Sequence, residues 1–249
     1  MPQLISTNSS IYLFLYSKPT MSLATTKNLT LLSSLIQGNK AILVQKLDLL
    51  NILQDKYGID QTCQYFVQSC PIVKASIGQH YRHSMDHIEL AALITSSSSS
   101  SACSYHKNDD KQEVVPLVLR YDLRVRGGTL EKDVKEATKR IHSVIQIFDE
   151  LQQNINIDSK MDKIHYYDNM NNIVSQKVNA SFMLSSDGNE ETELESTIGR
   201  ELGFCAHHAI HHMAMIKIIA TQTLGIHEEE LPIDFGRAPS TVRFDKNNQ

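Results

Sequence analysis

The residues best suited to chemistry in this chain are histidines, and they gather in two places. The first cluster comprises His80, His83 and His87, and the second places four of the eleven histidines at positions 207, 208, 211 and 212. On a helix of about 3.6 residues per turn, residues four apart lie on one face, about 6 Å apart along the axis. His208 and His212 are therefore placed to bind one metal ion, provided that this segment is helical.

The spacing leaves alternatives open in both clusters. His207 and His211 form a second pair about 100° around the same helix, and only one pair can face a given interior. Adjacent histidines can also be simply solvated. Two His-bearing helices nevertheless favour a metal site, because helical proteins usually build such sites where facing helices meet.

Apolar residues at three- and four-residue steps predict the helices that would position these histidines. The expected helices cover 28–57, 76–94, 129–154 and 196–224, with a short helix or ordered loop over 60–71. Ser76, Thr129 and Ser196 are the expected N-caps, and Gly58 and Gly225 are the expected terminators.

Polar and β-rich segments are expected between the helices. Six serines at 96–101 end the first His-bearing helix and open a disordered loop to about residue 112. Residues 121–126 alternate like an extended segment, and 164–184 predict a β-hairpin or two short strands before an acidic loop at 187–195. The resulting fold class is all-α: an up-down four-helix bundle with a small β-hairpin insertion and an extended C-terminal tail.

Length and composition fit one such domain. The chain has 249 residues, of which 41% are hydrophobic, and this is enough for a sizeable core. We predict a disordered N-terminal extension over 1–25, a single domain over 26–244 and a short tail over 245–249.

Charge and cysteine usage argue against several classes of protein. A net charge of −4 with scattered Lys and Arg is not the footprint of a nucleic-acid-binding protein. The four cysteines show no CxxC spacing and are interpreted as reduced thiols of an intracellular protein. The apolar run at 11–16 is too short to cross a membrane. We predict a cytoplasmic protein with no nucleic-acid partner and no membrane partner.

Three motifs and the C-terminal tail resemble one known family. They are the segments 76–87 (SIGQHYRHSMDH), 121–124 (YDLR) and 196–212 (STIGRELGFCAHHAIHH), and the tail segment 234–243 (DFGRAPSTVR). Over roughly residues 40 to 244 the chain resembles the DinB/YfiT-like family of metal-dependent four-helix-bundle proteins. The resemblance implies the same bundle for this chain.

The resemblance also implies a metal site. Family members typically place one His on the second helix and an HxxxH pair on the fourth, which together bind nickel, zinc or iron. Carried onto this sequence, the ligands are His83, His208 and His212. The chain has Met213-Ala-Met215 where the family often has Arg-Gly-Gln, which puts a substrate-binding role of that segment in doubt.

Family members with known activities imply a class of reaction. They include bacterial thiol S-transferases, a mycothiol-dependent isomerase and the N-terminal domain of ergothioneine synthases. Three neutral imidazoles leave a coordination position open, so the resemblance implies a metal that activates a thiol or water for transfer to, or hydrolysis of, a small molecule. The alternative is a non-catalytic metal-binding or structural bundle that acts as a homodimer or through a partner.

Two further residues are candidates for a catalytic role. His80 shares a helical stripe with His83, so it could be the ligand in place of His83 or donate to a carboxylate that supports the ligands. The alternative is a packed residue that lines the pocket. Glu201 lies seven residues before His208 on the same face, where it could orient a ligand or act as a general base. It could equally be a first-turn carboxylate that offsets the helix dipole.

The remaining polar candidates have structural alternatives that weigh more. His87 is expected to line the pocket or its rim. Cys205 is expected to be a small buried hydrophobic residue rather than a soft ligand, and Asp86 to form a surface ion pair. Arg124, Arg126 and Arg200 could bind an anionic substrate, but solvated side chains are expected.

Overall fold

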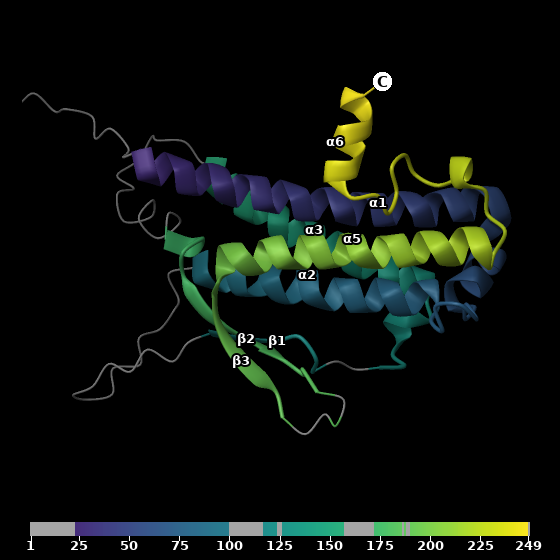
Figure 1. Ribbon diagram of the computed structural model, residues 1–249, viewed down its shortest axis with the longest axis horizontal. Helices are drawn as coiled ribbons and strands as arrows, with labels where there is room; N and C mark the ends of the chain where they lie inside the picture. Colours follow the sequence, from purple (N-terminus) through teal and green to yellow (C-terminus); the bar gives the residue numbers. More distant parts are fainter. Residues whose placement is uncertain are drawn as a thin grey trace, which may run out of the picture.

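Helices dominate the fold. The computed structural model describes residues 23–99, 117–123, 126–156, 172–185, 187 and 190–248. Its long helices are α1 (Leu23–Val67), α2 (Ile77–Ser99), α3 (Val134–Asn156) and α5 (Ile198–Gln222) (Figure 1). The expectation of a mostly helical fold is confirmed. Most of the N-terminal extension, the loop from residue 100 onward and the segment 164–171 lie outside the described residues.

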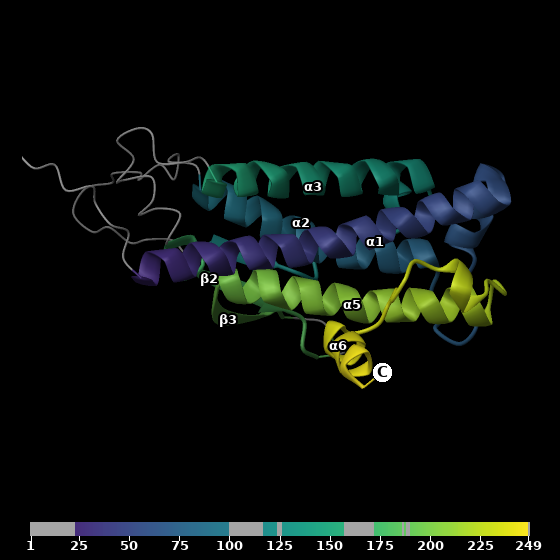
Figure 2. The same cartoon turned by 90° about the horizontal axis from the view of Figure 1, so that it is seen from above.

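The long helices pack side by side around one apolar core. α1 and α2 each contact α3 on one side and α5 on the other (Figure 2). The most extensive helix–helix contact joins α2 to α5. These two helices are antiparallel, because His80 near the start of α2 meets His212, whereas His87 farther along meets Cys205. The two predicted His-bearing helices are therefore direct neighbours.

Helix α1 continues past its expected end. Gly58 has a positive φ of 77° and interrupts the helical conformation, but a second helical stretch follows directly and continues to Val67. Gly58 therefore kinks the helix instead of ending it, and the predicted short helix after residue 60 becomes its continuation. A residue with a side chain would be strained at this φ.

The N-terminus of α2 follows the prediction. The hydroxyl of Ser76 accepts a hydrogen bond from the backbone N–H of Gln79, and the Gln79 side chain accepts one from the N–H of Ser76. This reciprocal pair is a capping box. The expected end at the serine run is wrong, since α2 extends to Ser99. Hydroxyls of Ser97 and Ser99 donate to carbonyls three residues earlier, which keeps these residues compatible with a helix.

Two predicted N-caps shift by a few residues. Thr129 begins a 3₁₀ turn, η1 (Thr129–Glu131), and Asp133 instead caps α3 by accepting from the N–H groups of Lys135 and Glu136. At α5 the hydroxyl of Thr197 accepts from the N–H of Arg200, so the cap is Thr197 rather than Ser196. In both cases another side chain with a suitable acceptor lies closer to the first helical turn.

A small sheet lies beside α2 at the end of the molecule where α5 begins (Figure 1). Its strands are β1 (Leu117–Arg120), β2 (Lys177–Phe182) and β3 (Thr192–Thr197), with β2 in the centre, parallel to β1 and antiparallel to β3. The predicted acidic loop is thus partly strand, because β3 pairs with β2. The expected extended segment at 121–126 instead follows strand β1.

The C-terminal segment folds back along the long helices. Phe235 is buried, and Gly236, with φ of 70°, lies so close to α5 that an added Cβ would meet the carbonyl oxygen of Met213 at 2.8 Å. A 3₁₀ turn, η2 (Glu228–Glu230), precedes this contact, and α6 (Pro239–Asn247) follows it. The tail is therefore helical at its end, not extended. Within the described ranges, none of the helices has the length and apolar character needed to cross a bilayer.

Candidate metal centre

Five histidines converge between α2 and α5. Helix α2 supplies His80, His83 and His87, and α5 supplies His208 and His212. His80, His87 and His212 are buried, while His83 and His208 are partly exposed. The residues at 207 and 211, which form the alternative pair, lie on the exposed face of α5. Packing of α5 against α2 therefore turns the pair His208 and His212 inward.

The ring nitrogen of His208 lies close to ring nitrogens of two other histidines. Nε2 of His208 lies 3.2 Å from Nε2 of His83 and 3.1 Å from Nε2 of His212. Two imidazoles that share an ion at metal–nitrogen distances of about 2.0–2.1 Å have their nitrogens about 3 Å apart. A single ring proton cannot bridge three nitrogens equally well. Imidazole nitrogens this close together are donors that could hold a metal ion.

His87 belongs to the same group by distance. Ligating atoms of His83, His87 and His208 all lie within 4.8 Å of one another, so these three could also hold a metal ion. The ring of His87 stacks on His208, with centroids 4.3 Å apart and planes 26° apart. The rings of His83 and His212 instead stand at 84° and 73° to that of His208. The sequence predicted His87 as a pocket or rim residue and not as a ligand, whereas it lies inside the group that could hold an ion.

His80 contacts His212 on the side away from His208. The two Nδ1 atoms are 2.7 Å apart. Burial, followed by the nearby Lys46 and His211, lowers the pKa of His80 to about 4. Burial and the surrounding histidines lower the pKa of His212 to about 2. Both imidazoles are therefore neutral at pH 7, and a neutral imidazole is the form that binds a metal.

A second layer of contacts holds the histidines in place. The ring of Tyr121, directly after β1, stacks on His87 with centroids 4.5 Å apart. Its hydroxyl donates to the Glu201 carboxylate at 2.7 Å and lies 3.4 Å from Sγ of Cys205. The thiol of Cys205 donates to the carbonyl of His87, and burial raises the pKa of this thiol to about 12. Cys205 therefore behaves as a buried thiol and not as a thiolate ligand.

Glu201 is fully buried, and its carboxylate accepts hydrogen bonds from several donors. Besides Tyr121, it accepts from the hydroxyl of Ser196 and from the guanidinium of Arg200 at 2.7 Å. These contacts tie the start of α5 to the sheet. They place Glu201 behind Tyr121 and His87, so it supports the cluster through these rings. A general-base role for Glu201 stays a prediction.

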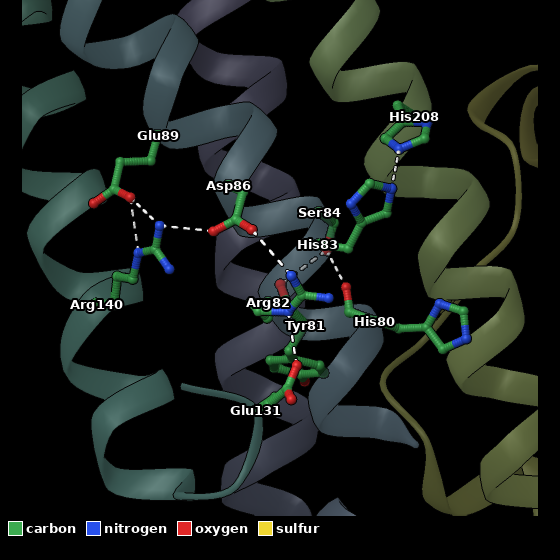
Figure 3. Close-up of polar contacts among 10 residues, drawn as sticks. All are labelled: His80, Tyr81, Arg82, His83, Ser84, Asp86, Glu89, Glu131, Arg140 and His208. Carbon is green, nitrogen blue, oxygen red and sulfur yellow. Dashed lines mark hydrogen bonds and ion pairs between the residues drawn. The ribbon is translucent and has the colours of Figure 1, made fainter. Parts of the chain in front are cut away.

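The other polar candidates lie apart from the cluster. Asp86 forms ion pairs with Arg140 at 2.9 Å and with Arg82 at 3.7 Å (Figure 3). Arg200 is exposed and bonds to Glu201, Arg126 is exposed, and Arg124 lies outside the described residues. Of the two candidate arginines that the structure describes, Arg200 is thus engaged by the buried Glu201 carboxylate.

One buried residue escaped the sequence reasoning. Lys46 of α1 is fully buried, and its ammonium donates to the hydroxyl of Ser84 at 2.6 Å and lies 4.4 Å from the ring centre of Tyr81. Burial lowers the pKa of Lys46 to about 7. The signal was available, because Lys46 interrupts the apolar stripe of α1 between Leu43 and Leu50.

Comparisons with known proteins add one partial similarity. No protein-family model matches the chain, and no solved structure matches it. The chain is 33% identical over 129 residues to a protein named FK506-binding protein 5 from Rhizopus delemar. The match covers 52% of this chain and 28% of that relative, so the chain spans well under a third of the relative's length.

Proposed function

We propose that this protein is a metal-dependent enzyme of the DinB/YfiT-like type, with four long helices forming the bundle of that family. One divalent ion would be held by His83, His208 and His212, and the ion would supply Lewis-acid activation of a thiol or water. The observation that carries the proposal is that Nε2 of His208 lies 3.2 Å from Nε2 of His83 and 3.1 Å from Nε2 of His212.

The ring planes favour His212 over His87 as the third ligand. An ion bound to an imidazole nitrogen lies close to the plane of that ring. The rings of His83, His208 and His212 stand at 73° to 89° to one another, so they can point their nitrogens at one ion from different directions. The stacked ring of His87 runs alongside that of His208, which suits a supporting contact better.

The side chains around the proposed ion would each have a defined role. The ligands hold the ion, His80 fixes the ring of His212 through Nδ1, and His87 with Tyr121 holds His208 by stacking. Three protein ligands leave a position for a small-molecule substrate, for which a thiol is the proposed class. The proposal also includes a cytoplasmic location. The name of the Rhizopus relative describes that protein and contributes no activity here.

Metal content tests this proposal. Protein purified without an affinity tag or chelator is compared by elemental analysis with a His208→Ala variant and with His142→Ala, a control that removes an exposed histidine of α3. We expect about one divalent ion per chain in the wild type and control, and a loss of more than about 100-fold in affinity in His208→Ala. A wild type that takes up neither nickel, zinc nor iron contradicts the proposal.

Two more variants separate the possible ligand sets. His212→Ala removes a proposed ligand and should lower metal affinity more than about 100-fold, whereas His87→Ala removes a supporting ring and should lower it about 10- to 100-fold. The reverse order would assign the site to His83, His87 and His208. Equal retention of metal in both variants would leave the non-catalytic structural bundle as the better description.

A further inference from the structure

Helix α6 stands apart from the rest of the protein. It projects out of the bundle in both ribbon views (Figure 1, Figure 2), and none of its residues is buried. A helix of nine residues is marginal in water unless one of its faces is packed. Phe244 of this helix is 67% exposed and presents its ring to solvent. Within the described residues, α6 therefore lacks the packed face that a helix of its length needs.

The base of α6 is held in this orientation. Phe235 is buried just before the helix, and the close approach of Gly236 to α5 fixes the chain at that point. The guanidinium of Arg237 donates to Asp234 at 2.7 Å and also pairs with Asp245 of α6. These contacts leave the rest of α6 pointing away from the long helices, where another molecule can reach it.

An open groove of about 540 Å³ runs along α1 beside the segment that leads to α6. Asp48 and Asp55 lie on one face of α1, about 10 Å apart along the axis, with Ile52 between them. Both carboxylates are exposed, and neither forms an ion pair with a described residue. Ile233, which is 89% exposed, lines the same groove. The groove is therefore apolar at its two isoleucines and acidic on either side of Ile52.

One face of α6 carries the complementary chemistry. Residues at three- and four-residue steps line an open hollow of about 450 Å³ on this helix: Ser240, Arg243, Phe244 and Asn247. Lys246 lies three residues after Arg243, and both cations are exposed without an ion pair to a described residue. The face therefore places an apolar ring beside two positive charges, whereas the groove places apolar side chains between two negative charges.

The two surfaces of one chain do not meet each other. No residue of α6 lines the α1 groove, because the base of α6 is held in the outward orientation. Two copies of the chain can bring them together. Since α6 and the groove lie side by side, a two-fold axis next to them would join two such contacts into one continuous interface. This doubles the area that one short helix could bury, toward the about 1,200–2,000 Å² of a stable complex.

We infer that α6 docks into the α1 groove of a second copy and so forms a two-fold symmetric homodimer. Phe244 packs against the apolar part of that groove, and Arg243 and Lys246 pair with Asp48 and Asp55 of the second copy. None of the five clustered histidines lines the groove, so the dimer does not depend on the proposed ion. The inference goes beyond the proposed function.

Charge reversal tests this arrangement. The mass of the protein is measured by analytical ultracentrifugation at micromolar concentrations, where we expect the wild type to be a dimer. Two double variants should be mostly monomeric: Arg243→Glu with Lys246→Glu, and Asp48→Lys with Asp55→Lys. Each reversal sets like charges against each other in both contacts, which should raise the dissociation constant by about 100-fold or more.

Mixing the two double variants separates a second copy from any other partner. In the mixed pair, each α6 faces a groove of opposite charge, so both contacts are restored and a heterodimer should form. The matched control, Lys135→Glu with Lys139→Glu, reverses two exposed charges of α3 and should dimerise like the wild type. All these variants change exposed residues, so circular dichroism should show the wild-type helix content.

Three results would overturn the inference. A wild type that stays monomeric is the first, and if α6 instead closed onto the groove of its own chain, Phe244→Asp would lower the thermal unfolding midpoint of that monomer. A dimer that neither double variant weakens is the second, because its interface lies elsewhere. The third is a mixture of the two variants that stays monomeric, because charge pairing between α6 and the groove then does not join the copies.

Discussion

The two sides of helix α2 differ in how their charged and polar groups are paired. Toward α3, Arg82 pairs with Glu131 at 2.8 Å, and Arg140 pairs with Asp86 and Glu89 (Figure 3). Toward α5, the same helix presents three histidines, and the nearby charge, Lys46, has no ion-pair partner among the described residues.

The difference separates a structural network from a candidate site. In the α3 network, each cation has a carboxylate within reach, which is what a buried polar group needs in a finished fold. On the α5 side, imidazole nitrogens face one another at 2.7 to 3.2 Å. A group of close imidazole nitrogens could hold a metal ion, so the contrast itself points to function.

The largest expected effect concerns Lys46. Its pKa is about 7 in the folded protein and about 10.4 in an unfolded chain, so between these values the unfolded state binds more protons and stability rises with pH. Relative to Lys46→Met, the wild type should gain about 3 kcal/mol of unfolding free energy from about pH 7 to about pH 10. Chemical denaturation of both proteins measures this, and parallel pH profiles would show that Lys46 is not desolvated.

The second-largest expected effect is a loss of stability on breaking an ion pair on the side of α2 that faces α3. Glu131→Ala leaves the buried Arg82 with only Asp86, at 3.7 Å, and should lower the free energy of unfolding by about 2 kcal/mol in urea denaturation. Replacing both partners, as Arg82→Met with Glu131→Leu, should restore most of this stability, because no unpaired charge remains. Metal content should be unchanged in both proteins. A loss of metal in Glu131→Ala would show that the two sides are coupled.

A smaller effect is expected where the cluster meets the sheet. Tyr121→Phe removes one donor to Glu201 but keeps the ring on His87, so stability should fall by about 1 kcal/mol with metal affinity retained. Tyr121→Leu removes the ring as well and should lower metal affinity by about 10- to 100-fold. Calorimetric metal titration distinguishes the two variants. Equal affinities would mean that stacking does not hold the histidines.

The smallest effect is expected at the outer edge of the α3 network. Arg140 is about a quarter exposed, as is Glu89. Arg140→Gln should therefore lower stability by only about 0.5 kcal/mol, and high salt should shrink the difference further. Denaturation at low and high ionic strength measures it. A loss as large as that in Glu131→Ala would place Arg140 among the buried pairs.

Local patterns in the sequence determined much of this protein. The helical periodicity placed the four long helices, and Ser76 marked the start of α2 because capping depends on neighbouring residues only. The spacing of histidines likewise marked one stripe on each of two helices, and the family resemblance selected His83, His208 and His212 from them. Helix ends were less accurate, since a nearby residue with a better acceptor, such as Asp133, could take over the cap.

Only the tertiary structure decided how these pieces meet. The pairing of β2 with β3 depends on contacts between segments that no local pattern specifies, and so the acidic segment became a strand. The choice between the two histidine pairs of α5, the place of His87 inside the cluster and the burial of Lys46 were fixed by packing against α1 and α2. Desolvation and ring contacts are properties of the assembled interior, and the sequence lists only the residues from which that interior is built.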